Sequence, residues 1–431
     1  MNLDITIQPG LLKGKVKIPP SKSIAHRAII CAALANGVST IENIELSDDI
    51  LVTIKAMAAL GACIKFQENV LKVKGIPFGA YENKQKGGEP IKIDCNESGS
   101  TLRFLIPITI SFGGSFRFIG RGNLGKRPLD PYYRILEKQG IFYKAKEEKL
   151  DLEVQGQLKP GIFSVPGNVS SQFISGLLFA LPLLKGDSTI EITTPLESIA
   201  YIDLTLRVLK SFGVSIHHSQ YQEFFIEGNQ KFYPQKYWIE GDYSQGAFFL
   251  VADALGSEVM VESLVENSLQ GDRVIIDILK RMGVPLSHRE NGLQAVTPDI
   301  LQAITIDGSQ CPDIIPVLTG AACFSRGTTE IVNAGRLRIK ESDRLSALYQ
   351  ELTKLGAKMK EHYDGLTIKG VKKLRGNQTL WSHKDHRIAM TLAIVATICD
   401  GPVKIQDAQC VSKSYPGFWE DFKALGGNLY E

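Results

Sequence analysis

The chain repeats one pattern six times along its 431 residues. Each repeat consists of a short β-like run, a polar stretch, an apolar helix-like run, a break and a second β-like run. The repeats begin near Val16, Ile91, Ile162, Tyr237, Ile304 and Leu380. A period of roughly 70 residues exceeds the ~20–50 residues of most solenoid repeats, so the pattern predicts packed α/β units rather than a solenoid.

Each repeat contains two helix-like segments of different character. The first is apolar on all sides, which predicts a fully buried helix, whereas the second is amphipathic and predicts one face toward solvent. Each amphipathic segment stops at a glycine, the usual residue just past a helix C-terminus. These segments are Asp49–Leu60, Tyr132–Gln139, Leu204–Phe212, Val274–Met282, Leu345–Leu355 and Phe418–Leu425. Each repeat is therefore approximately βαβαβ, with sheets and outer helices around buried central helices.

A polar stretch divides the six repeats into two sets of three. Residues 229–235 contain a Tyr-Pro pair and separate the third repeat from the fourth. The predicted domains are residues 20–238, and residues 1–19 together with 239–431, with an active-site cleft between them. The early strand Leu3–Gln8 is assigned to the second domain. The polar, glycine-containing composition of residues 82–90 predicts a surface loop.

Composition narrows the possible partners. The chain has 49 Lys and Arg against 46 Asp and Glu, a net charge of +3. A dedicated nucleic-acid binder usually shows a stronger basic bias, so small anionic ligands are favoured and no nucleic-acid partner is expected. The longest apolar runs fall well short of the ~20 residues of a membrane span. With no leader-like start and no C-x-x-C among seven cysteines, we expect a cytoplasmic protein with no membrane partner.

The polar residues that precede and open each buried helix, here called knots, carry unexpected cations. Free backbone N–H groups and the helix dipole make such an end attractive to anions, so acidic side chains would stabilise it. Any single cation there could simply reach solvent. The same departure in three repeats favours an anion site. The first, second and sixth knots contain Lys22, Ser23 and Arg27; Ser100 and Arg103; and His386 and Arg387.

Three other polar groups have both a structural and a functional interpretation. Ser170, Ser171 and Gln172 at the third knot either cap a helix or donate to a phosphate. The charged run 336–344 is either a solvated segment or part of a site. Asp313 opens an apolar run, as an N-cap residue would. With Glu341 it could instead divide general acid and base work, if burial and nearby cations separate their pKa values.

One motif imitates a dinucleotide site. Gly120–Gly125 matches G-x-G-x-x-G after a predicted strand, but Lys126-Arg127-Pro128 follows, so the helix should start too late for that fingerprint. Two arginines in the loop suggest phosphate contact without a dinucleotide. The chain also lacks the His and Cys spacings of zinc sites and the acidic spacing of calcium loops. Neither a metal nor a redox cofactor is expected.

Eight short blocks, in order along the whole chain, resemble the EPSP synthase family of enolpyruvyl transferases. They are Pro20–Arg27, Ser98–Arg103, Val169–Phe173, Tyr201–Asp203, Cys311–Asp313, Arg338–Arg344, Asp385–Arg387 and Ser412–Pro416. The resemblance implies an α/β fold of two domains forming an inside-out α/β barrel, each domain with three βαβαββ units around buried helices. It also implies a transferase with no cofactor, and we expect a monomer.

The implied reaction moves the enolpyruvyl group of phosphoenolpyruvate to the 5-hydroxyl of shikimate 3-phosphate and releases phosphate, within chorismate and aromatic amino acid biosynthesis. By resemblance, shikimate 3-phosphate is held by Lys22, Ser23, Arg27, Ser170, Ser171, Gln172, Ser198, Tyr201, Asp313 and Lys340. Phosphoenolpyruvate is held by Lys22, Gly99, Arg127, Gln172, Arg344, Arg387 and Lys413. The candidate catalytic residues are Asp313, Glu341 and Lys22, and their division of labour stays open.

Two alternatives and two departures accompany this prediction. The sister enzymes that act on UDP-N-acetylglucosamine typically have Lys-Asn where this chain has Lys22-Ser23, and a loop cysteine that Ser111–Pro128 lacks. An RNA-binding or RNA-processing protein on a related fold would need a basic track with interleaved aromatics. Glu97 and Arg336 replace residues common in the family, which puts details of affinity in doubt but not the reaction class.

Overall fold

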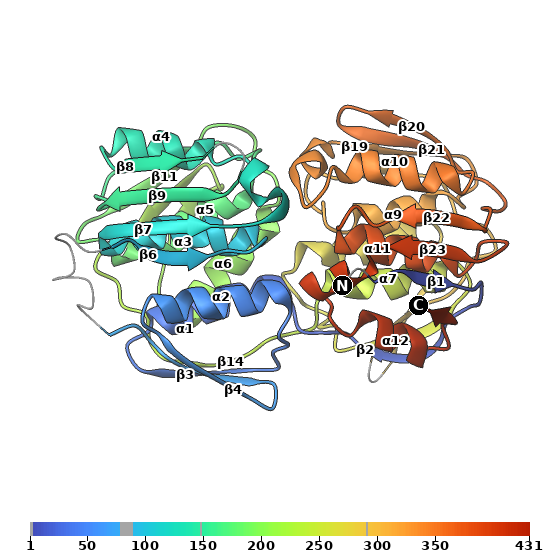
Figure 1. Ribbon diagram of the computed structural model, residues 1–431, viewed down its shortest axis with the longest axis horizontal. Helices are drawn as coiled ribbons and strands as arrows, with labels where there is room; N and C mark the ends of the chain where they lie inside the picture. Colours follow the sequence, from blue (N-terminus) through green and yellow to red (C-terminus); the bar gives the residue numbers. More distant parts are fainter. Residues whose placement is uncertain (1–2, 78–88, 147–148, 290–291) are drawn as a thin grey trace. The chain divides into compact units, whose positions relative to one another are not determined.

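The computed structural model describes residues 3–77, 89–146, 149–289 and 292–431. The predicted loop at 82–90 therefore lies mostly outside the described residues. The chain divides into two compact units: unit 1 is residues 1–19 with 240–431, and unit 2 is residues 20–239. Each unit has its own cluster of buried apolar side chains. Figure 1 shows unit 2 from blue to green, and unit 1 mainly from yellow to red.

Every sheet in the described part of the chain has four strands in one order, shown by the second repeat. Strands β6 (Ile91–Asp94) and β7 (Gly114–Ile119) are parallel, joined through the buried helix α3 (Gly99–Phe112). After the outer helix α4 (Asp130–Lys138), strands β8 (Phe142–Ala145) and β9 (Asp151–Gly156) complete the order β6-β7-β9-β8 with antiparallel pairs. Each repeat is therefore βαβαββ, one strand longer than the βαβαβ pattern predicted from the sequence repeats alone.

The remaining elements of unit 2 form two further copies. They are α1 (Lys22–Leu34), β3 (Val38–Glu42), α2 (Asp48–Ala59), β4 (Cys63–Gln67), β5 (Val70–Lys74), β10 (Ile162–Val165), α5 (Ser171–Ala180), β11 (Ser188–Ile192), α6 (Ile199–Ser211), β12 (His217–Ser219), β13 (Glu223–Ile226) and β14 (Lys236–Trp238). Short 3₁₀ turns lie at η1 (Gly122–Lys126) and η2 (Leu181–Leu183).

Unit 1 repeats the plan three times. Its strands are β1 (Ile5–Ile7), β2 (Lys13–Lys17), β15 (Glu258–Glu262), β16 (Leu286–Arg289), β17 (Gly292–Ala295), β18 (Thr305–Asp307), β19 (Thr328–Val332), β20 (Lys358–His362), β21 (Gly365–Lys369), β22 (Gln378–Trp381), β23 (Val403–Gln406) and β24 (Leu429–Tyr430). Its helices are α7 (Tyr243–Ala254), α8 (Ile275–Arg281), α9 (Ile315–Ala322), α10 (Arg344–Lys354), α11 (His386–Ala396) and α12 (Phe418–Ala424). Its 3₁₀ turns are η3 (Gly271–Val274), η4 (Gly335–Ile339) and η5 (Ala408–Lys413).

The first and fourth repeats exchange their leading strands, which the repeat pattern did not predict. Strand β2 precedes α1 in the chain, but it pairs in parallel with β15, with Val16 opposite Val261. Strand β14 precedes α7, but it pairs with β3, with Tyr237 opposite Ile41. Both strands lead into a buried helix with the same pattern, so nothing local reveals which sheet each joins.

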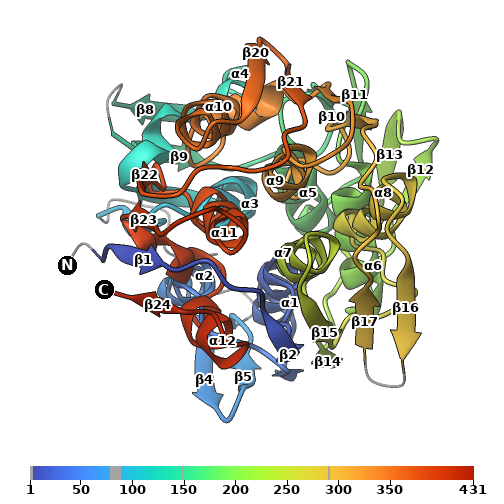
Figure 2. The ribbon, with the colours of Figure 1, turned by 90° about the vertical axis from the view of Figure 1, so that its right-hand side faces the viewer.

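The two predicted helix types are present. All residues of α7 are buried, and α9 and α11 are equally enclosed; in Figure 2 the three lie side by side with the sheets of unit 1 around them. The amphipathic helices α2, α4, α10 and α12 start and end within two residues of the predicted bounds. Helix α6 instead begins at Ile199, five residues before the predicted start.

Across residues 3–77, 89–146, 149–289 and 292–431, no helix combines the length and apolar character needed to cross a membrane.

Candidate active site

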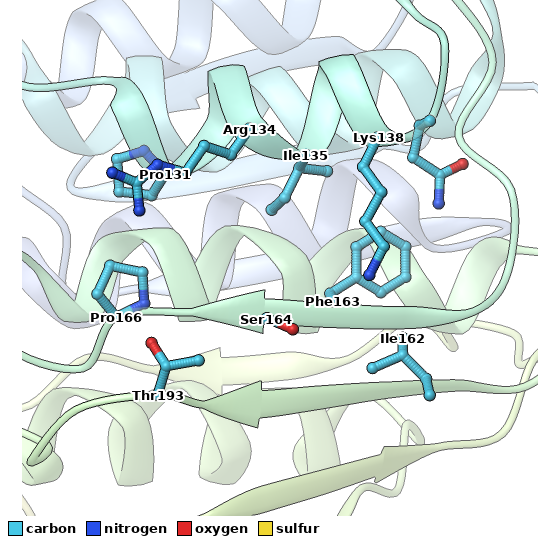
Figure 3. A pocket seen from close by; sticks show the side chains of 10 residues that line it. Pro131, Arg134, Ile135, Lys138, Ile162, Phe163, Ser164, Pro166 and Thr193 are labelled. Carbon is cyan, nitrogen blue, oxygen red and sulfur yellow. The ribbon is translucent and has the colours of Figure 1, made fainter.

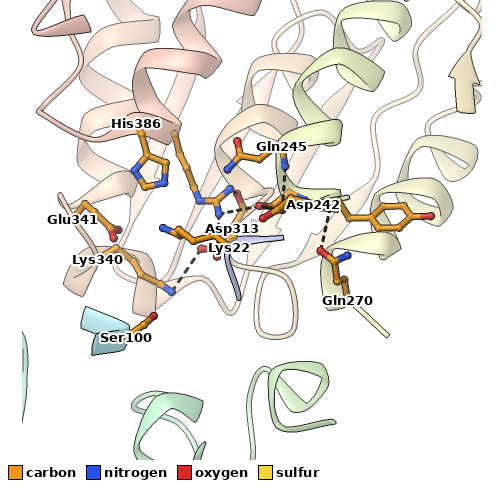
Figure 4. A network of polar contacts seen from close by, with 12 residues as sticks. Lys22, Ser100, Asp242, Gln245, Gln270, Asp313, Lys340, Glu341 and His386 are labelled. Carbon is orange, nitrogen blue, oxygen red and sulfur yellow. Dashed lines mark hydrogen bonds and ion pairs between the residues drawn. The ribbon is translucent and has the colours of Figure 1, made fainter. Parts of the chain in front are cut away.

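In unit 1 the fourth, fifth and sixth knots converge on the guanidinium of Arg387. Its Nη1 donates to the carbonyl of Asp313 at 2.9 Å, and its Nη2 lies 3.2 Å from the Asp313 carboxylate. Nη2 also donates to Ser244 Oγ at 3.1 Å. Because Ser244, Asp313 and Arg387 lie at the starts of α7, α9 and α11, the buried helices bring these residues to one place. Figure 4 shows Asp313 near Lys340 and Glu341.

Arg344 is the most enclosed cation of this cluster, with its side chain 1% exposed. Its guanidinium donates to Asp385 at 2.8 Å, to Glu341 at 2.8 Å and to Asp313 at 3.1 Å. Burial alone would lower the pKa of Arg344, but the three carboxylates outweigh it and the pKa lies above its usual value. The guanidinium is therefore permanently charged and held in one orientation.

Asp313 is ionised in this arrangement. Burial alone would raise the pKa of its carboxyl group, but Arg387, Lys340 and Arg344 together hold that pKa well below its usual range. An ionised carboxylate accepts hydrogen bonds and protons but has no proton to give near neutral pH. The Asp313 carboxylate therefore acts as a hydrogen-bond acceptor within the cluster.

Lys340 lies at the edge of the same cluster. Its Nζ is 3.7 Å from Asp313 Oδ1 and its side chain is 29% exposed. Burial lowers its pKa to about 8, with Arg344 and Arg336 acting in the same direction against the attraction of Asp313 and Glu341. Its charge thus depends on pH close to the physiological range.

Only part of the charged run 336–344 belongs to the site. Arg338 pairs with Asp343 and Glu361, each at 2.8 Å, and donates to the Tyr363 carbonyl, so it braces the loop. Arg336 donates to the Ser309 carbonyl at 2.9 Å. The solvated-segment interpretation is therefore wrong for Arg344, while Arg338 has a structural role.

Unit 2 surrounds its central cation with uncharged groups. Arg27 Nε donates to Thr205 Oγ1 at 2.8 Å, while its two Nη atoms donate to the carbonyls of Ser23 and Tyr201 at 2.7 and 2.9 Å. The guanidinium also lies over the Phe104 ring at 5.2 Å. Burial lowers the pKa of Arg27 to about 10, although it stays a cation at neutral pH. Because these hydrogen-bond partners carry no negative charge, a bound anion could neutralise the Arg27 guanidinium.

The second and third knots meet at Gln172. Arg103 Nη1 donates to Gln172 Oε1 at 2.8 Å, and Gln172 Nε2 donates to Ser100 Oγ at 3.0 Å. Gly99 lies beside this amide, and a methyl group on its Cα would come within 2.6 Å of Arg127 Nη1. Glycine at this position therefore leaves the space that the Arg127 guanidinium occupies. Gly99, Arg127 and Gln172, three of the residues predicted for the phosphoenolpyruvate site, therefore lie together in unit 2.

Lys22 is held by a carboxylate that the sequence analysis missed. Its Nζ lies 2.8 Å from Asp49 Oδ2, and both side chains are largely buried. Asp49 lies in the first turn of α2, where an acidic residue is an ordinary stabilising choice, so it carried no signal. Asp385 was missed for the same reason: it caps α11 by accepting from Arg387 N at 3.0 Å while also binding Arg344.

The other predicted residues lie at the ends of helices. Ser170 caps α5 by accepting from Gln172 N, which the capping interpretation predicted, and Ser171 is the buried first residue of α5. Ser198 occupies the N-cap position of α6 in a left-handed conformation with φ +56°. Buried Lys413 ends η5, which packs against α11 in unit 1.

The G-x-G-x-x-G segment does not open a helix. Its last glycines form η1, and α4 starts only at Asp130, as the following Lys-Arg-Pro predicted. Gly122 has φ +55°, and a Cβ there would lie 2.3 Å from Glu97 Oε1. The Glu97 side chain thus lies against this loop. The segment has the role of a close-packed turn rather than a dinucleotide site.

A shallow groove of unit 2 lies between α4 and β10, lined by Arg134, Ile135 and Lys138 on one side and Phe163 and Ser164 on the other (Figure 3). None of the predicted site residues lines it.

Comparisons with known proteins identify the family of the chain. Residues 7–422 match the family model for EPSP synthase (3-phosphoshikimate 1-carboxyvinyltransferase). The chain is 59% identical to the 3-phosphoshikimate 1-carboxyvinyltransferase of Clostridium beijerinckii, over 98% of each chain. It is 56% identical to that of Clostridioides difficile, over 99% of this chain and 98% of the relative.

Solved structures confirm the fold class. The EPSP synthase of Acinetobacter baumannii matches with a TM-score of 0.81 and 26% identity, covering 100% of this chain and 99% of the other. The enolpyruvyl transferase NikO of Streptomyces tendae shares the fold at 16% identity, with a TM-score of 0.79 over 100% and 99% of the two chains. The predicted two-domain inside-out α/β barrel is thereby confirmed. Sequence, fold and residue pattern place the chain in the EPSP synthase (3-phosphoshikimate 1-carboxyvinyltransferase) family.

Proposed function

We propose that this protein transfers the enolpyruvyl group of phosphoenolpyruvate to the 5-hydroxyl of shikimate 3-phosphate and releases inorganic phosphate. The observation that carries the proposal is the convergence of Arg344 and Arg387 on Asp313, in a chain of this family. Two fixed guanidinium groups suit a ligand with a carboxylate and a phosphate. The ionised carboxylate between them can face a hydroxyl group.

The phosphoenolpyruvate site of the proposal draws on both units. Unit 1 supplies Arg344, Arg387 and Lys413, and unit 2 supplies Lys22, Gly99, Arg127 and Gln172. Phosphoenolpyruvate carries its charge on two separate groups, and charge builds up on the phosphate as it leaves. Fixed cations stabilise that charge without reorganising during the reaction.

Shikimate 3-phosphate is assigned mainly to unit 2. We assign its phosphate and ring to Ser23, Arg27, Ser170, Ser171, Gln172, Ser198 and Tyr201. Lys22 and Lys340 also bind this substrate, and Asp313 contacts its ring hydroxyl groups. The uncharged surroundings of Arg27 support this assignment, because a buried cation without a carboxylate partner gains most from a bound phosphate.

The chemistry then needs one proton donor and one proton acceptor. Protonation of the methylene carbon makes the neighbouring carbon electrophilic, and the 5-hydroxyl attacks it while losing its proton. Ionised Asp313 accepts that proton or orients the hydroxyl. Glu341 or Lys22 donates to the methylene carbon. In the second half, the new methyl group returns a proton as the carbon–oxygen bond to phosphate breaks.

The proposal also covers assembly and location: a cytoplasmic monomer that acts on these two small molecules without nucleic acid. Because the proposed residues come from both units, substrate binding should draw the units together. Small-angle scattering with both substrates present should show a smaller radius of gyration than without them. Unchanged dimensions would count against a shared site.

Phosphate release tests the reaction directly. Purified protein with both substrates and a chelator should release phosphate, and omission of either substrate should abolish release. Asp313→Asn should lose most of the rate while still folding. Release with UDP-N-acetylglucosamine in place of shikimate 3-phosphate would point to the sister reaction, and no release with either acceptor would reject the proposal.

A further inference from the structure

A second buried carboxylate of α10 contacts the loop that opens α11. Glu351 is 2% exposed and lies seven residues after Arg344, so both side chains are on one face of the helix. Its carboxylate accepts from Lys354 Nζ at 2.7 Å and from the backbone N–H of Trp381 at 3.0 Å. It also lies 3.0 Å from His383 Nε2. None of these contacts is explained by the proposed reaction.

The segment that Glu351 contacts has an unfavourable backbone. His383 and Lys384 follow one another with φ +52° and +56°, a left-handed conformation that costs energy for residues other than glycine. Such a turn persists only where its surroundings hold it. The His383 and Trp381 rings lie 4.2 Å apart, and Trp381 Nε1 donates to Asp407 at 2.9 Å. Glu351 binds the backbone at one end of this turn and the His383 ring within it.

The turn leads directly into the charged cluster. Asp385 follows Lys384 in the chain, binds Arg344 at 2.8 Å and caps the helix at Arg387 N. Helix α10 therefore holds this loop at two places, through Arg344 at Asp385 and through Glu351 at Trp381 and His383. Beside the hydrogen bonds from Ser382 to Gln406 and Asp407, two attachments to one rigid helix restrict the orientation of the turn more than the attachment at Asp385 alone would.

We propose that Glu351 is a positioning residue: it holds the turn from Trp381 to Asp385 in the shape that presents Asp385 to Arg344 and Arg387 to Asp313. Glu351 itself does not touch the substrate. Its role passes through the turn, and its effect should appear mainly in the binding of phosphoenolpyruvate, the ligand assigned to Arg344 and Arg387.

The charge of Glu351 fits this role. Burial alone would raise the pKa of its carboxyl group, but the hydrogen bonds from His383, Lys354 and Trp381 outweigh burial and the pKa lies below its usual value. The three partners of Glu351 lie in two places. Trp381 and His383 belong to the turn, whereas Lys354 lies on α10 and its side chain is 45% exposed. Removal of Lys354 should thus leave the turn intact, which provides a matched control.

Steady-state kinetics compares Glu351→Gln with Lys354→Met. This inference rests on the proposed function, so phosphate release by the wild-type protein is measured first. No release would reject the proposed function, whereas release with no change of KM in the variant would reject only the role of Glu351. Glutamine keeps the shape but cannot accept from every partner, so we expect the KM for phosphoenolpyruvate to rise about tenfold. The KM for shikimate 3-phosphate should change less than about twofold, and Lys354→Met should leave both KM values near wild type.

Two further measurements separate positioning from a general loss of stability. Hydrogen exchange of the peptide containing residues 381–387 should be faster in Glu351→Gln than in Lys354→Met. Leu279→Ala, a core truncation on α8, should lower the melting temperature without changing the KM ratio. If Glu351→Gln fails to fold, His383→Phe offers a second test, because it keeps an aromatic ring but loses the bond to Glu351. The KM for phosphoenolpyruvate should then rise by less than tenfold, and the KM for shikimate 3-phosphate should again change little. Equal rises in both KM values, or unchanged exchange, would overturn the proposal.

Discussion

Arg27 in unit 2 and Arg344 in unit 1 are both almost fully buried, with 2% and 1% of each residue exposed, but their neighbours differ in charge. In the described part of the chain, every hydrogen-bond partner of Arg27 is an uncharged oxygen, and burial lowers its pKa to about 10. Arg344 binds three carboxylates, which raise its pKa. One cation is held by the fold yet remains available to a ligand, while the other is part of an internally balanced cluster.

The difference shows two ways to keep a cation inside a protein. Around Arg344, the protein supplies the counter-charges, so the cluster is a structural element as well as the proposed phosphoenolpyruvate site. Around Arg27, hydroxyl and carbonyl oxygens satisfy the donors but not the charge. Removal of each side chain should therefore affect stability and substrate binding in different proportions.

Arg344→Met should have the largest effect. It leaves Asp385, Glu341 and Asp313 without their shared cation, and removing one partner of a buried ion pair typically costs about 3–5 kcal/mol of unfolding free energy. Turnover should fall by at least about a thousandfold, because charge stabilisation and orientation are lost together. Urea unfolding and phosphate release measure the two effects.

Arg338→Met is the matched control for that variant. Arg338 also pairs with two carboxylates but is 22% exposed, so its loss should cost no more than about 1 kcal/mol and leave turnover unchanged. Equal losses for the two variants would remove the distinction between the cluster and an ordinary charged loop.

Arg27→Met should separate binding from stability. The variant leaves no carboxylate uncompensated, so the unfolding free energy should change by less than for Arg344→Met. The loss of a charge-assisted contact should raise the KM for shikimate 3-phosphate by about 10- to 100-fold. An equal rise in the KM for phosphoenolpyruvate would contradict the assignment of Arg27 to the phosphorylated ring.

Lys340 should make substrate binding depend on pH. With a pKa of about 8 in the folded protein, its ammonium group loses its proton as pH rises through that value. The KM for shikimate 3-phosphate should rise by up to about tenfold between pH 7 and pH 9. Lys340→Arg keeps its charge throughout and should flatten that profile, so an identical rise in this variant would assign the titration to another group.

His26 should affect the stability of unit 2 rather than turnover, and only below about pH 6.5. Burial lowers its pKa to about 3, with Lys22 and Arg27 acting in the same direction against Asp49. Below its unfolded pKa of about 6.5, the unfolded chain binds a proton that the folded unit does not. Stability should fall on acidification from pH 6.5 toward pH 3, by at most about 1.4 kcal/mol per pH unit. The difference between wild type and His26→Leu in urea midpoints at pH 7 and 5.5 isolates this contribution.

The sequence predicted the parts of the fold that depend on local pattern. The glycine after each amphipathic segment marked the ends of α2, α10 and α12 because a left-handed residue stops a helix wherever it lies. The repeat pattern did not predict that β2 pairs with β15 and β14 with β3, since strand pairing depends on partners far away in the chain, although the predicted domain bounds put β2 in the second domain and β14 in the first. The early start of α6 follows from Ser198 in a left-handed cap, which a serine does not announce.

The site was predictable to a similar extent. Cations at helix starts stood out because they oppose the helix dipole, and Arg27 and Arg387 indeed lie in polar clusters. Their acidic partners did not stand out. Asp49 and Asp385 occupy positions where acids stabilise any helix, so their second role as partners of Lys22 and Arg344 depends on tertiary contacts. The ionisation state of Asp313 likewise depends on cations from α10, from α11 and from the segment between η4 and α10.

The pairing of β1 with β23 and β24 has a consequence for biosynthesis. Residues 5–7 pair with residues 403–405 and 429–430, and β2 pairs with β15. Strands β1 and β2 therefore cannot pair until residues much later in the chain have been synthesised. All strands of the sheets of unit 2 lie between residues 38 and 238, so unit 2 can fold while synthesis continues. Until unit 1 closes, the nascent chain carries the unpaired apolar strand β1, and slow translation or chaperone shortage should expose it to aggregation during that interval.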